Sequence, residues 1–274
     1  MNIIDKFIIE YDTEYPVYKQ LAQLAHDELE SEVINRGIKA IITNRAKRPE
    51  RLKEKIQKRN VEKKYKSKKA IYNDIVDLVG VRVALYFPSE RDIVGKVIEE
   101  IFQVVETKSF PPDPYKPKYN KRFSGYWATH YRVKLKETDK IPAKFINRVF
   151  EIQIASVLML AWSEVEHDLV YKPFTGELSD EELSILDEIN GLVIAGEIAL
   201  ERLQKAMSKR TRKQLEISSK YDLTNMLFSN YQNIHESKPD FGNTEYINNY
   251  LRAVEKIKTT EIIESLKNIN TNIK

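Results

Sequence analysis

The chain has 274 residues, and its 45 lysines and arginines against 41 aspartates and glutamates give a formal net charge of +4 at pH 7. This length fits one large domain or a domain with an appendage, and the absence of cysteine excludes disulfides and thiolate metal sites. No apolar run in the sequence approaches the roughly 18 residues of a membrane span, and the acidic amino terminus does not fit a secretory signal. We therefore expect a soluble cytoplasmic protein with no membrane partner.

The first predicted element is a helix over residues 15–37. Its apolar side chains recur at three- and four-residue spacing, and Gly37 is typical of the residue at which a helix stops. A short apolar segment, residues 40–43, follows the helix. The chain is therefore expected to pass from an amphipathic helix into an extended segment.

Four cations then come from two consecutive elements. Arg45 and Lys47 alternate outward from the extended segment, and Arg51 and Lys55 lie four residues apart on a helix that Pro49 begins. Like charges at this helical spacing repel by a few tenths of a kcal/mol. Cations that converge from two elements favour a polyanion, most simply a triphosphate, although a solvated basic helix gives the same pattern.

A central strand is predicted from Val79 onward, where apolar and β-branched residues are dense. Gly80 indicates a bulge or a close backbone approach. An acid such as Asp77, beside a buried strand, is costly unless it is paired or binds a metal. Two interpretations stay open: an internal ion pair with Arg82, or a Mg2+ site shared with Glu151 from a neighbouring strand.

A long loop of prolines and basic residues occupies residues 108–125. Loops of this length inside a compact domain are usually functional or disordered. Tyr126 follows the loop, and Lys121 and Arg122 precede it closely. An aromatic ring beside cations suits a stacked purine base with its phosphates on the basic side chains, and a tyrosine packed under its own loop is the alternative. The elements predicted around the loop are a helix over 92–102 and strands over 103–107 and 131–135.

Residues 150–154 alternate between apolar and polar side chains, which is the pattern of a strand with one buried face. Glu151 and Gln153 are on its polar side. From Ala155 the apolar spacing changes to three and four residues, which indicates an amphipathic helix. Glu151 is therefore expected on the polar face of a core strand, beside that helix.

The sequence has no glycine-rich phosphate loop of the Walker or GxGxxG type, and its four histidines are isolated from one another. Nucleotide phosphates would therefore be held by side chains and a metal ion. The pair His167-Asp168 lacks the upstream histidines that a hydrolase metal site needs, so we predict no activity of that hydrolase type.

The rest of the chain is predicted to be helical. Ser179 and Glu182 form a capping box, and apolar spacing continues one long helix to about residue 215. Basic residues are concentrated at its carboxyl end, where they either interact favourably with the helix dipole or contact nucleic acid. A weaker helix over 223–231 and a last amphipathic helix over 243–268 follow.

Four motifs, in order along the chain, resemble those of the RelA/SpoT alarmone synthetase domain, and the basic stretch at Arg45 resembles that family's amino-terminal basic motif. The resemblance covers roughly residues 15–175 and implies an α+β, nucleotidyltransferase-like fold with a mixed β-sheet flanked by helices. We expect a synthetase domain over 1–175 and a helical carboxy-terminal extension over 176–274. The motifs are Asp77-Leu-Val-Gly80-Val-Arg82, Gly125-Tyr126 with His130, Glu151-Ile-Gln153-Ile, and Ala161-Trp162 with Glu166-His167 and Tyr171-Lys172.

The resemblance implies a pyrophosphokinase that transfers the β,γ-pyrophosphate of ATP to the 3′-hydroxyl of GDP or GTP, making (p)ppGpp in the stringent response with Mg2+ as cofactor. By the same resemblance, Asp77 holds Mg2+, and Glu151 completes the metal site and activates the acceptor hydroxyl. Arg45 and Arg82 would enclose the adenine. The expected ATP-binding residues are Arg45, Lys47, Arg51, Lys55 and Arg82, and the expected acceptor-binding residues are Lys121, Arg122, Tyr126, His130 and Gln153.

Three positions depart from the family pattern. Arg51 stands where a serine is usual, Trp127 follows Tyr126 where a basic residue is usual, and Ala155 stands where many members carry arginine. The departures bear on the acceptor more than on the type of reaction.

A second interpretation keeps the donor and changes the acceptor. Some small family members are toxins of toxin–antitoxin pairs, which make (p)ppApp or pyrophosphorylate the 3′ end of tRNA. The basic tracts over 58–69 and 205–213 favour tRNA, and the balanced net charge argues against it. A non-catalytic nucleotide sensor is a third class, which the presence of Asp77 and Glu151 disfavours. The expected partners are ATP with GDP or GTP, and then tRNA, an antitoxin protein or a second copy of the chain.

Overall fold

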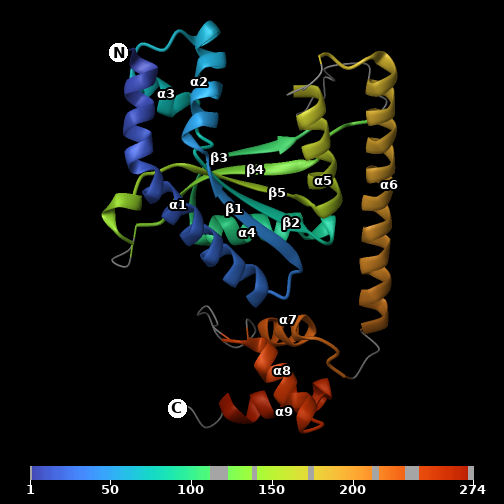
Figure 1. The fold of residues 1–274 in the computed structure, drawn as a ribbon. Helices are drawn as coiled ribbons and strands as arrows, with labels where there is room; N and C mark the ends of the chain where they lie inside the picture. The colour runs from blue at the N-terminus through green and yellow to red at the C-terminus, as the bar shows by residue number, and fades with distance from the viewer. Residues whose placement is uncertain are drawn as a thin grey trace.

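The computed structural model describes residues 2–111, 123–137, 141–171, 176–211, 216–231 and 241–270. The strands in these residues are β1 (Ala40–Ala46), β2 (Val79–Leu85), β3 (Phe102–Phe110), β4 (Ala128–Leu135) and β5 (Phe150–Ser156). They form one sheet in the order β1-β2-β5-β4-β3. Adjacent strands are antiparallel, except β2 and β5, which are parallel. The predicted α+β fold with a mixed sheet flanked by helices is confirmed (Figure 1).

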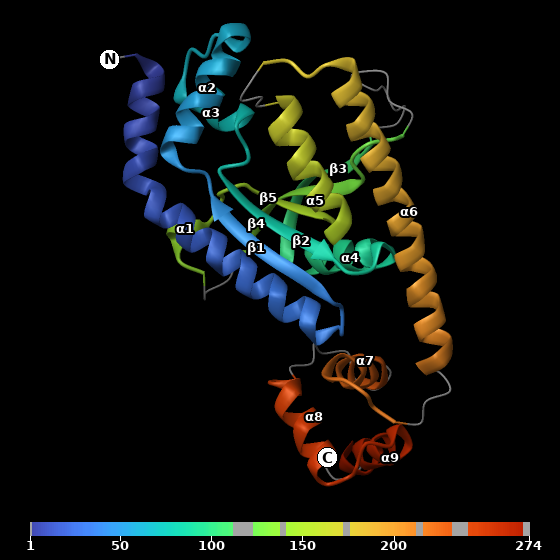
Figure 2. The same cartoon turned by 45° about the vertical axis from the view of Figure 1, so that its right-hand side comes forward.

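The helices cover both faces of the sheet. They are α1 (Ile3–Asn35), α2 (Pro49–Lys63), α3 (Lys68–Asp74), α4 (Arg91–Ile101), α5 (Val157–Glu166), α6 (Asp180–Thr211), α7 (Lys220–Tyr231), α8 (Thr244–Ala253) and α9 (Thr259–Asn270). Short 3-10 turns lie at Pro88–Glu90 and Ala143–Phe145, and a π-helical turn at His167–Tyr171. α1 and α4 pack on one face, α5 lies over the other, and α6 runs beside α5 (Figure 2). No described helix has the length and apolarity of a bilayer span.

The main core lies between the sheet and the helices α1 and α4. On β5, Phe150, Ile152 and Ile154 are fully buried, whereas Glu151 and Gln153 are half-buried on the opposite face. Alternation along an extended chain places successive side chains on opposite faces of a sheet, so the predicted polar face of this strand is confirmed. Arg82 and His130 stand opposite Gln153 on the neighbouring strands, so their side chains share that polar face.

The first helix begins well before the predicted range of 15–37. Phe7 and Tyr11 are fully buried and extend its apolar face toward the amino terminus. Pro16 lies inside the helix, where a proline removes one backbone hydrogen bond. Gly37 follows the helix with a φ of 68°, in the left-handed conformation that favours glycine.

The predicted last helix over 243–268 is two helices, α8 and α9. Glu255 has a φ of 56°, and the backbone N–H of Lys256 donates to the carbonyl of Leu251. A residue in the left-handed region with a backward hydrogen bond of this kind ends an α-helix. The amphipathic pattern continues across the break, so periodicity alone did not reveal it.

The helices α7, α8 and α9 form a small cluster next to the carboxyl end of α1 (Figure 1). Lys39 lies over the ring of Tyr221 with 5.0 Å between the ammonium and the ring centroid. A Cβ added at Gly37 would lie 2.8 Å from the carbonyl oxygen of Tyr221, so the close approach of α7 depends on that glycine. The apolar centre of the cluster consists of Ile217, Leu223, Leu227 and Ile262.

Candidate active site

Asp77 lies just before β2 and accepts hydrogen bonds from two lysines. The Nζ atoms of Lys47 and Lys55 each lie 2.6 Å from Asp77 Oδ2. Lys47 directly follows β1 and Lys55 is on α2, so a strand end and a helix deliver the two ammonium groups. The ion pair with Arg82 that the sequence left open is not formed, because Asp77 stands ahead of the strand and turns toward the lysines.

This cluster carries a surplus of positive charge. Burial opposes ionisation of Asp77, but the two lysines outweigh it and lower the pKa of the carboxyl to about 2. Burial lowers the pKa of Lys47 against the attraction of Asp77, and the cations Lys55 and Arg45 lower it further. One carboxylate is shared by two ammonium groups, so the place favours a further anion.

The backbone of Lys47 is fixed from two sides. Its N–H donates to the carbonyl of Leu78 at 2.8 Å, which continues the β1–β2 ladder. The hydroxyl of Tyr11 donates to the carbonyl of Lys47 at 2.6 Å. Burial raises the pKa of Tyr11, so the hydroxyl keeps its proton. The sequence analysis missed Tyr11 because it precedes the predicted start of the helix.

Glu151, His130 and Gln153 form a hydrogen-bonded group on β4 and β5. Glu151 Oε1 lies 3.3 Å from His130 Nδ1, and Gln153 Nε2 donates to Glu151 Oε2 at 2.7 Å. Burial raises the pKa of Glu151, but His130 and Gln153 outweigh it, so the pKa is lowered. Asp77 acts in the raising direction, which shows that the two carboxylates are within electrostatic reach of each other.

Arg82 on β2 adjoins this group. Its Nε donates to Gln153 Oε1 at 3.3 Å, and its terminal nitrogen pairs with Glu164 on α5. Strand register places Arg82 directly opposite Gln153. A helix and a strand therefore fix the guanidinium.

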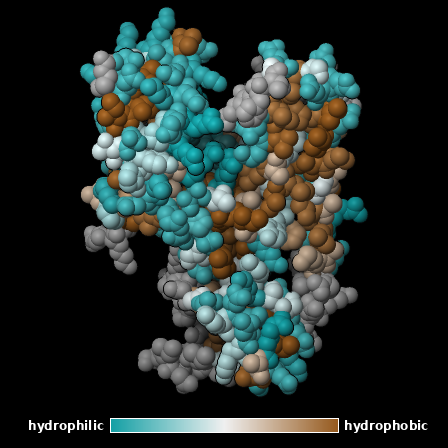
Figure 3. All heavy atoms as spheres, viewed as in Figure 1, coloured by the Kyte–Doolittle hydropathy of each residue, from teal (hydrophilic) through white to brown (hydrophobic). Residues whose placement is uncertain are grey.

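Gly80 lies in a regular ladder, opposite Arg45 on β1 and Glu151 on β5, so the predicted bulge is wrong. A Cβ added at this glycine would meet no heavy atom within 4 Å. Arg45 is exposed on the same face. The glycine thus leaves space between the arginine and the glutamate, and Figure 3 shows a hollow lined with hydrophilic residues on this side of the molecule.

Tyr126 is partly buried beside His130. Its hydroxyl lies 3.3 Å from His130 Nε2, and its ring centroid is 5.9 Å from that of Phe110. Burial raises the pKa of Tyr126, so the phenol is neutral. Since His130 also contacts Glu151, one histidine connects the aromatic ring to the carboxylate. The ring also packs against a small apolar cluster made of Ala128, Ala155, Met159 and Trp162.

One predicted site residue, Arg51, is not part of this assembly, and two others lie outside the described residues. Arg51 pairs with Glu54 at 3.1 Å, and its side chain is 69% exposed. Lys121 and Arg122 lie outside the described residues. The predicted residues that the structure does bring to one side of the sheet are Arg45, Lys47, Lys55, Asp77, Arg82, Tyr126, His130, Glu151 and Gln153.

The carboxylates suit a Mg2+ ion that is shared with a nucleotide. Among the described residues there is no group of three or more His, Cys, Asp or Glu side chains placed to hold a metal. Mg2+ usually binds through one or two carboxylates together with waters and substrate phosphates. Asp77 Oδ1 is buried and has no hydrogen-bond partner in the part of the chain that the structure describes. That oxygen, with Glu151 in electrostatic reach, fits this mode of binding.

The profile described as "Region found in RelA / SpoT proteins" matches residues 44–175. That range contains all the predicted residues that the structure brings together, whereas Tyr11 lies outside it. Residues 44–175 of the chain therefore form a RelA/SpoT region. The comparison with curated proteins gives no match.

Solved structures of family proteins share the fold. A GTP pyrophosphokinase family protein from Streptococcus pneumoniae is 19% identical with a TM-score of 0.58, and the match covers 73% of this chain and 96% of that one. Small alarmone synthetase 1 from Bacillus subtilis is 18% identical with a TM-score of 0.58, covering 73% and 98%. Small alarmone synthetase 2 from the same organism is 21% identical with a TM-score of 0.53, covering 72% and 99%. More than a quarter of this chain lies outside each of these matches.

Proposed function

We propose that this protein is a pyrophosphokinase that transfers the β,γ-pyrophosphate of ATP to the 3′-hydroxyl of GDP or GTP. The observation that carries the proposal is the pair of lysines on Asp77 beside the hydrogen-bonded carboxylate of Glu151. The lysines offer surplus positive charge to a triphosphate, and Glu151 offers a proton acceptor to a hydroxyl. Phosphoryl-type transfer needs this combination of neutralised charge and positioning more than covalent help.

On the donor side, Lys47 and Lys55 bind the phosphates of ATP. Arg45 and Arg82 lie on adjacent strands and on the same face, so their planar guanidinium groups can enclose an adenine ring. Asp77 and Glu151 would hold Mg2+, which would neutralise phosphate charge when bound. Arg51 is left out of the donor site because its side chain turns to Glu54.

On the acceptor side, Tyr126 stacks on the base and Glu151 takes the proton of the 3′-hydroxyl. His130 and Gln153 hold Glu151 ionised, which keeps it ready to accept that proton. The 3′-oxygen attacks the β-phosphorus of ATP, the bond between the α,β-bridging oxygen and the β-phosphorus breaks, and AMP leaves. Lys121 and Arg122 are assigned to the acceptor phosphates by their place in the sequence.

A shared fold with nucleotide-binding proteins supports these assignments. Small alarmone synthetase 1 from Bacillus subtilis has been solved bound to its product pppGpp, with a TM-score of 0.56 to this chain, and bound to AMPCPP, with a TM-score of 0.53. Both structures are of that protein. They support a nucleoside triphosphate donor and a guanosine product for this chain.

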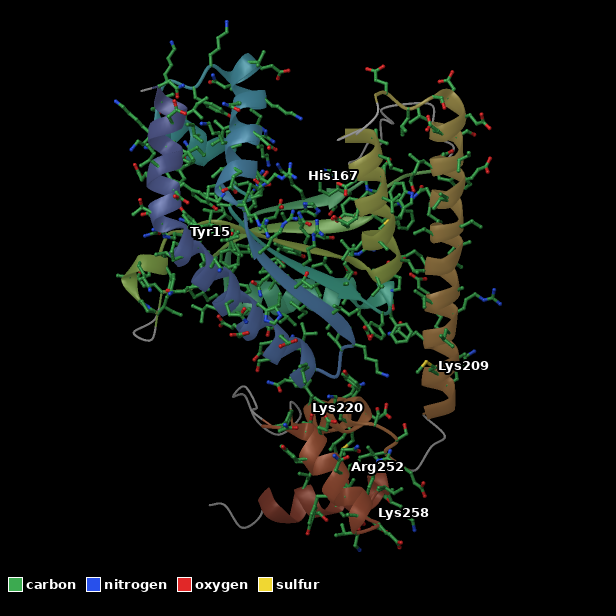
Figure 4. The ribbon with its side chains drawn as sticks, in the orientation of Figure 1. Tyr15, His167, Lys209, Lys220, Arg252 and Lys258 are labelled. Atoms are coloured by element: carbon green, nitrogen blue, oxygen red, sulfur yellow. The ribbon has the colours of Figure 1, made fainter. Side chains whose placement is uncertain are left out.

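The second candidate acceptor is the 3′ end of tRNA or an adenine nucleotide, as in a toxin that an antitoxin neutralises. Figure 4 shows Lys209 at the end of α6 and Lys220, Arg252 and Lys258 on the α7–α9 cluster, at the opposite end of the molecule from His167. Lys220 also pairs with Glu245 at 2.9 Å. Glu164 on α5 pairs with Arg82 of the site, and His167 directly follows α5. These cations therefore lie away from that side of the site, and a mononucleotide acceptor does not need them. GDP or GTP is the favoured acceptor.

The deciding experiment follows labelled pyrophosphate from ATP with Mg2+ to GDP, GTP, ATP and deacylated tRNA in parallel. Glu151→Gln serves as the inactive control. We expect label in a guanosine product. Label on tRNA or on an adenine nucleotide alone would instead support the toxin, and no transfer to any acceptor would contradict the enzymatic function.

A further inference from the structure

We infer that α6 is part of the acceptor site. Asn190, assisted by Asp187 and Gly191, is a positioning residue that holds segment 123–125 and so fixes the position of Tyr126. The inference rests on the proposed function, because it concerns how the acceptor-binding tyrosine is held. It also assigns α6 to the catalytic unit, although the sequence suggested a boundary at 175/176.

Asn190 binds both backbone groups of the residue that precedes Tyr126. The N–H of Gly125 donates to Asn190 Oδ1 at 3.1 Å, and Asn190 Nδ2 donates to the carbonyl of Gly125 at 3.4 Å. Asn190 is 1% exposed, so its amide depends on these partners in place of water. Gly125 has a φ of 78°, a conformation that glycine adopts at little cost. The backbone before Tyr126 is therefore fixed in both conformation and position.

Asp187 adds a second contact from the same face of α6, three residues earlier. Its Oδ1 accepts from the N–H of Phe123 at 3.3 Å, and the side chain is 2% exposed. Residues three apart on a helix are neighbours on one face. Two buried polar side chains of α6 thus both bond to the backbone of residues 123–125.

The helix also receives the ring of Phe123. A Cβ added at Gly191 would lie 2.5 Å from Cζ and 2.6 Å from Cε2 of that ring. No real contact is that short, so alanine at this position displaces the ring. The glycine lets the aromatic side chain reach the helix surface next to Asn190.

The contacts continue from α6 to the proposed catalytic carboxylate. Trp127 Nε1 donates to Ser124 Oγ across Gly125. The hydroxyl of Tyr126 lies within hydrogen-bond distance of His130, and His130 lies within hydrogen-bond distance of Glu151. A displacement of Gly125 is therefore passed to the stacking ring and to the histidine, whereas the ammonium groups of Lys47 and Lys55 on the donor side are held by Asp77.

A purely structural role for Asn190 makes a different prediction from a positioning role. Loss of a buried hydrogen bond that only stabilises the fold lowers the melting temperature and leaves both Michaelis constants unchanged. A positioning residue changes the KM for the acceptor and spares the KM for ATP. The two constants, measured on the folded full chain, separate the roles.

We would measure both constants for four full-length variants. Asn190→Ala removes both bonds to Gly125, and we expect the acceptor KM to rise about tenfold, with the ATP KM within about twofold of its starting value. Asn190→Asp keeps an acceptor for the Gly125 N–H and is expected to fall between the wild type and Asn190→Ala. Gly191→Ala should raise the acceptor KM in the same direction. Ser184→Ala, an exposed polar residue of α6, is the matched control.

Equal changes in the two constants, or no change in either, would overturn the inference. Quenching of Trp127 fluorescence by acrylamide provides a second reading that needs no activity. Trp127 is 38% exposed and Trp162 only 3%, so the quenched signal comes from Trp127. It should be quenched more strongly in Asn190→Ala than in Ser184→Ala. Unchanged quenching would refute the role of the contact between Asn190 and Gly125. Absence of pyrophosphate transfer by the wild type would refute only the proposed reaction.

Discussion

The hydroxyl of Tyr11 donates to the carbonyl oxygen of Lys47 at 2.6 Å, and this bond ties the first helix to the lysine that pairs with Asp77. The two residues are 36 positions apart in the chain. Tyr11 is fully buried, so no water replaces the bond if the hydroxyl is removed. The donor side of the site thus depends on a residue that touches neither phosphate nor metal.

Tyr11→Phe should therefore lower both stability and donor binding. The carbonyl of Lys47 would lose its partner, which costs about 1–2 kcal/mol in the free energy of unfolding. We expect that loss in urea unfolding and a few-fold rise in the KM for ATP. Tyr15→Phe, one turn further along α1 (Figure 4), is the matched control. Equal effects of the two substitutions would show that the bond to Lys47 contributes nothing specific.

Lys55→Ala should weaken ATP binding with little loss of stability. The substitution removes one of the two ammonium groups on Asp77 and so the surplus charge offered to the triphosphate. We expect the KM for ATP to rise about tenfold, because a charge-assisted bond is worth roughly 1.5–3 kcal/mol. Lys58→Ala, exposed one turn further along α2, should change it less than about twofold. Similar constants for both variants would mean that the whole basic helix, and not this position, attracts the nucleotide.

Arg51→Ser introduces the serine that is usual in the family, and it should change activity and stability very little, because Arg51 does not belong to the proposed donor site. The guanidinium pairs with Glu54 on an exposed helix surface, and exposed pairs of this kind contribute about 0–1 kcal/mol. We expect the KM for ATP and the melting temperature to stay close to their starting values. A several-fold rise in that KM would instead show that Arg51 turns inward when ATP binds, as the sequence analysis predicted.

The stability of the fold should fall as pH rises, because of Glu90. Burial raises the pKa of Glu90 to about 7, against the bond from Gln204 and the charge of Lys39, which lower it. The folded state therefore binds this proton more tightly than the unfolded state, whose pKa is near 4.5. The destabilisation by Glu90 is absent at low pH, grows as the pH rises from about 4.5 to about 7, and levels off above about pH 7.

Comparison with Glu90→Gln isolates this effect from other titrating groups. After allowance for the partial exposure of Glu90, we expect the wild type to lose about 1–2 kcal/mol relative to the variant between pH 5 and pH 8. Urea unfolding at several pH values measures the difference. Stability curves that run parallel across this range would contradict the raised pKa.

Several features were predictable because they depend on local patterns. The alternation around Glu151 determined which face of β5 is polar, since successive side chains of a strand point to opposite faces. The capping box was also local: the N–H of Ser179 donates to the carboxylate of Glu182, and the N–H of Glu182 donates to Ser179 Oγ. The mixed sheet and the RelA/SpoT region over residues 44–175 followed from ordered motifs in the sequence.

The partners of the charged groups were decided only by the tertiary structure. Whether Asp77 pairs with Arg82 or with the lysines depends on where β2 begins and on how α2 is placed beside it. Local spacing in the sequence encodes neither of these. The contact between Asn190 and Gly125 joins residues 65 positions apart, and Tyr11 reaches Lys47 only because α1 packs against β1. Periodicity is a property of neighbouring residues, whereas a site is made by strand order and helix packing, which bring distant residues together.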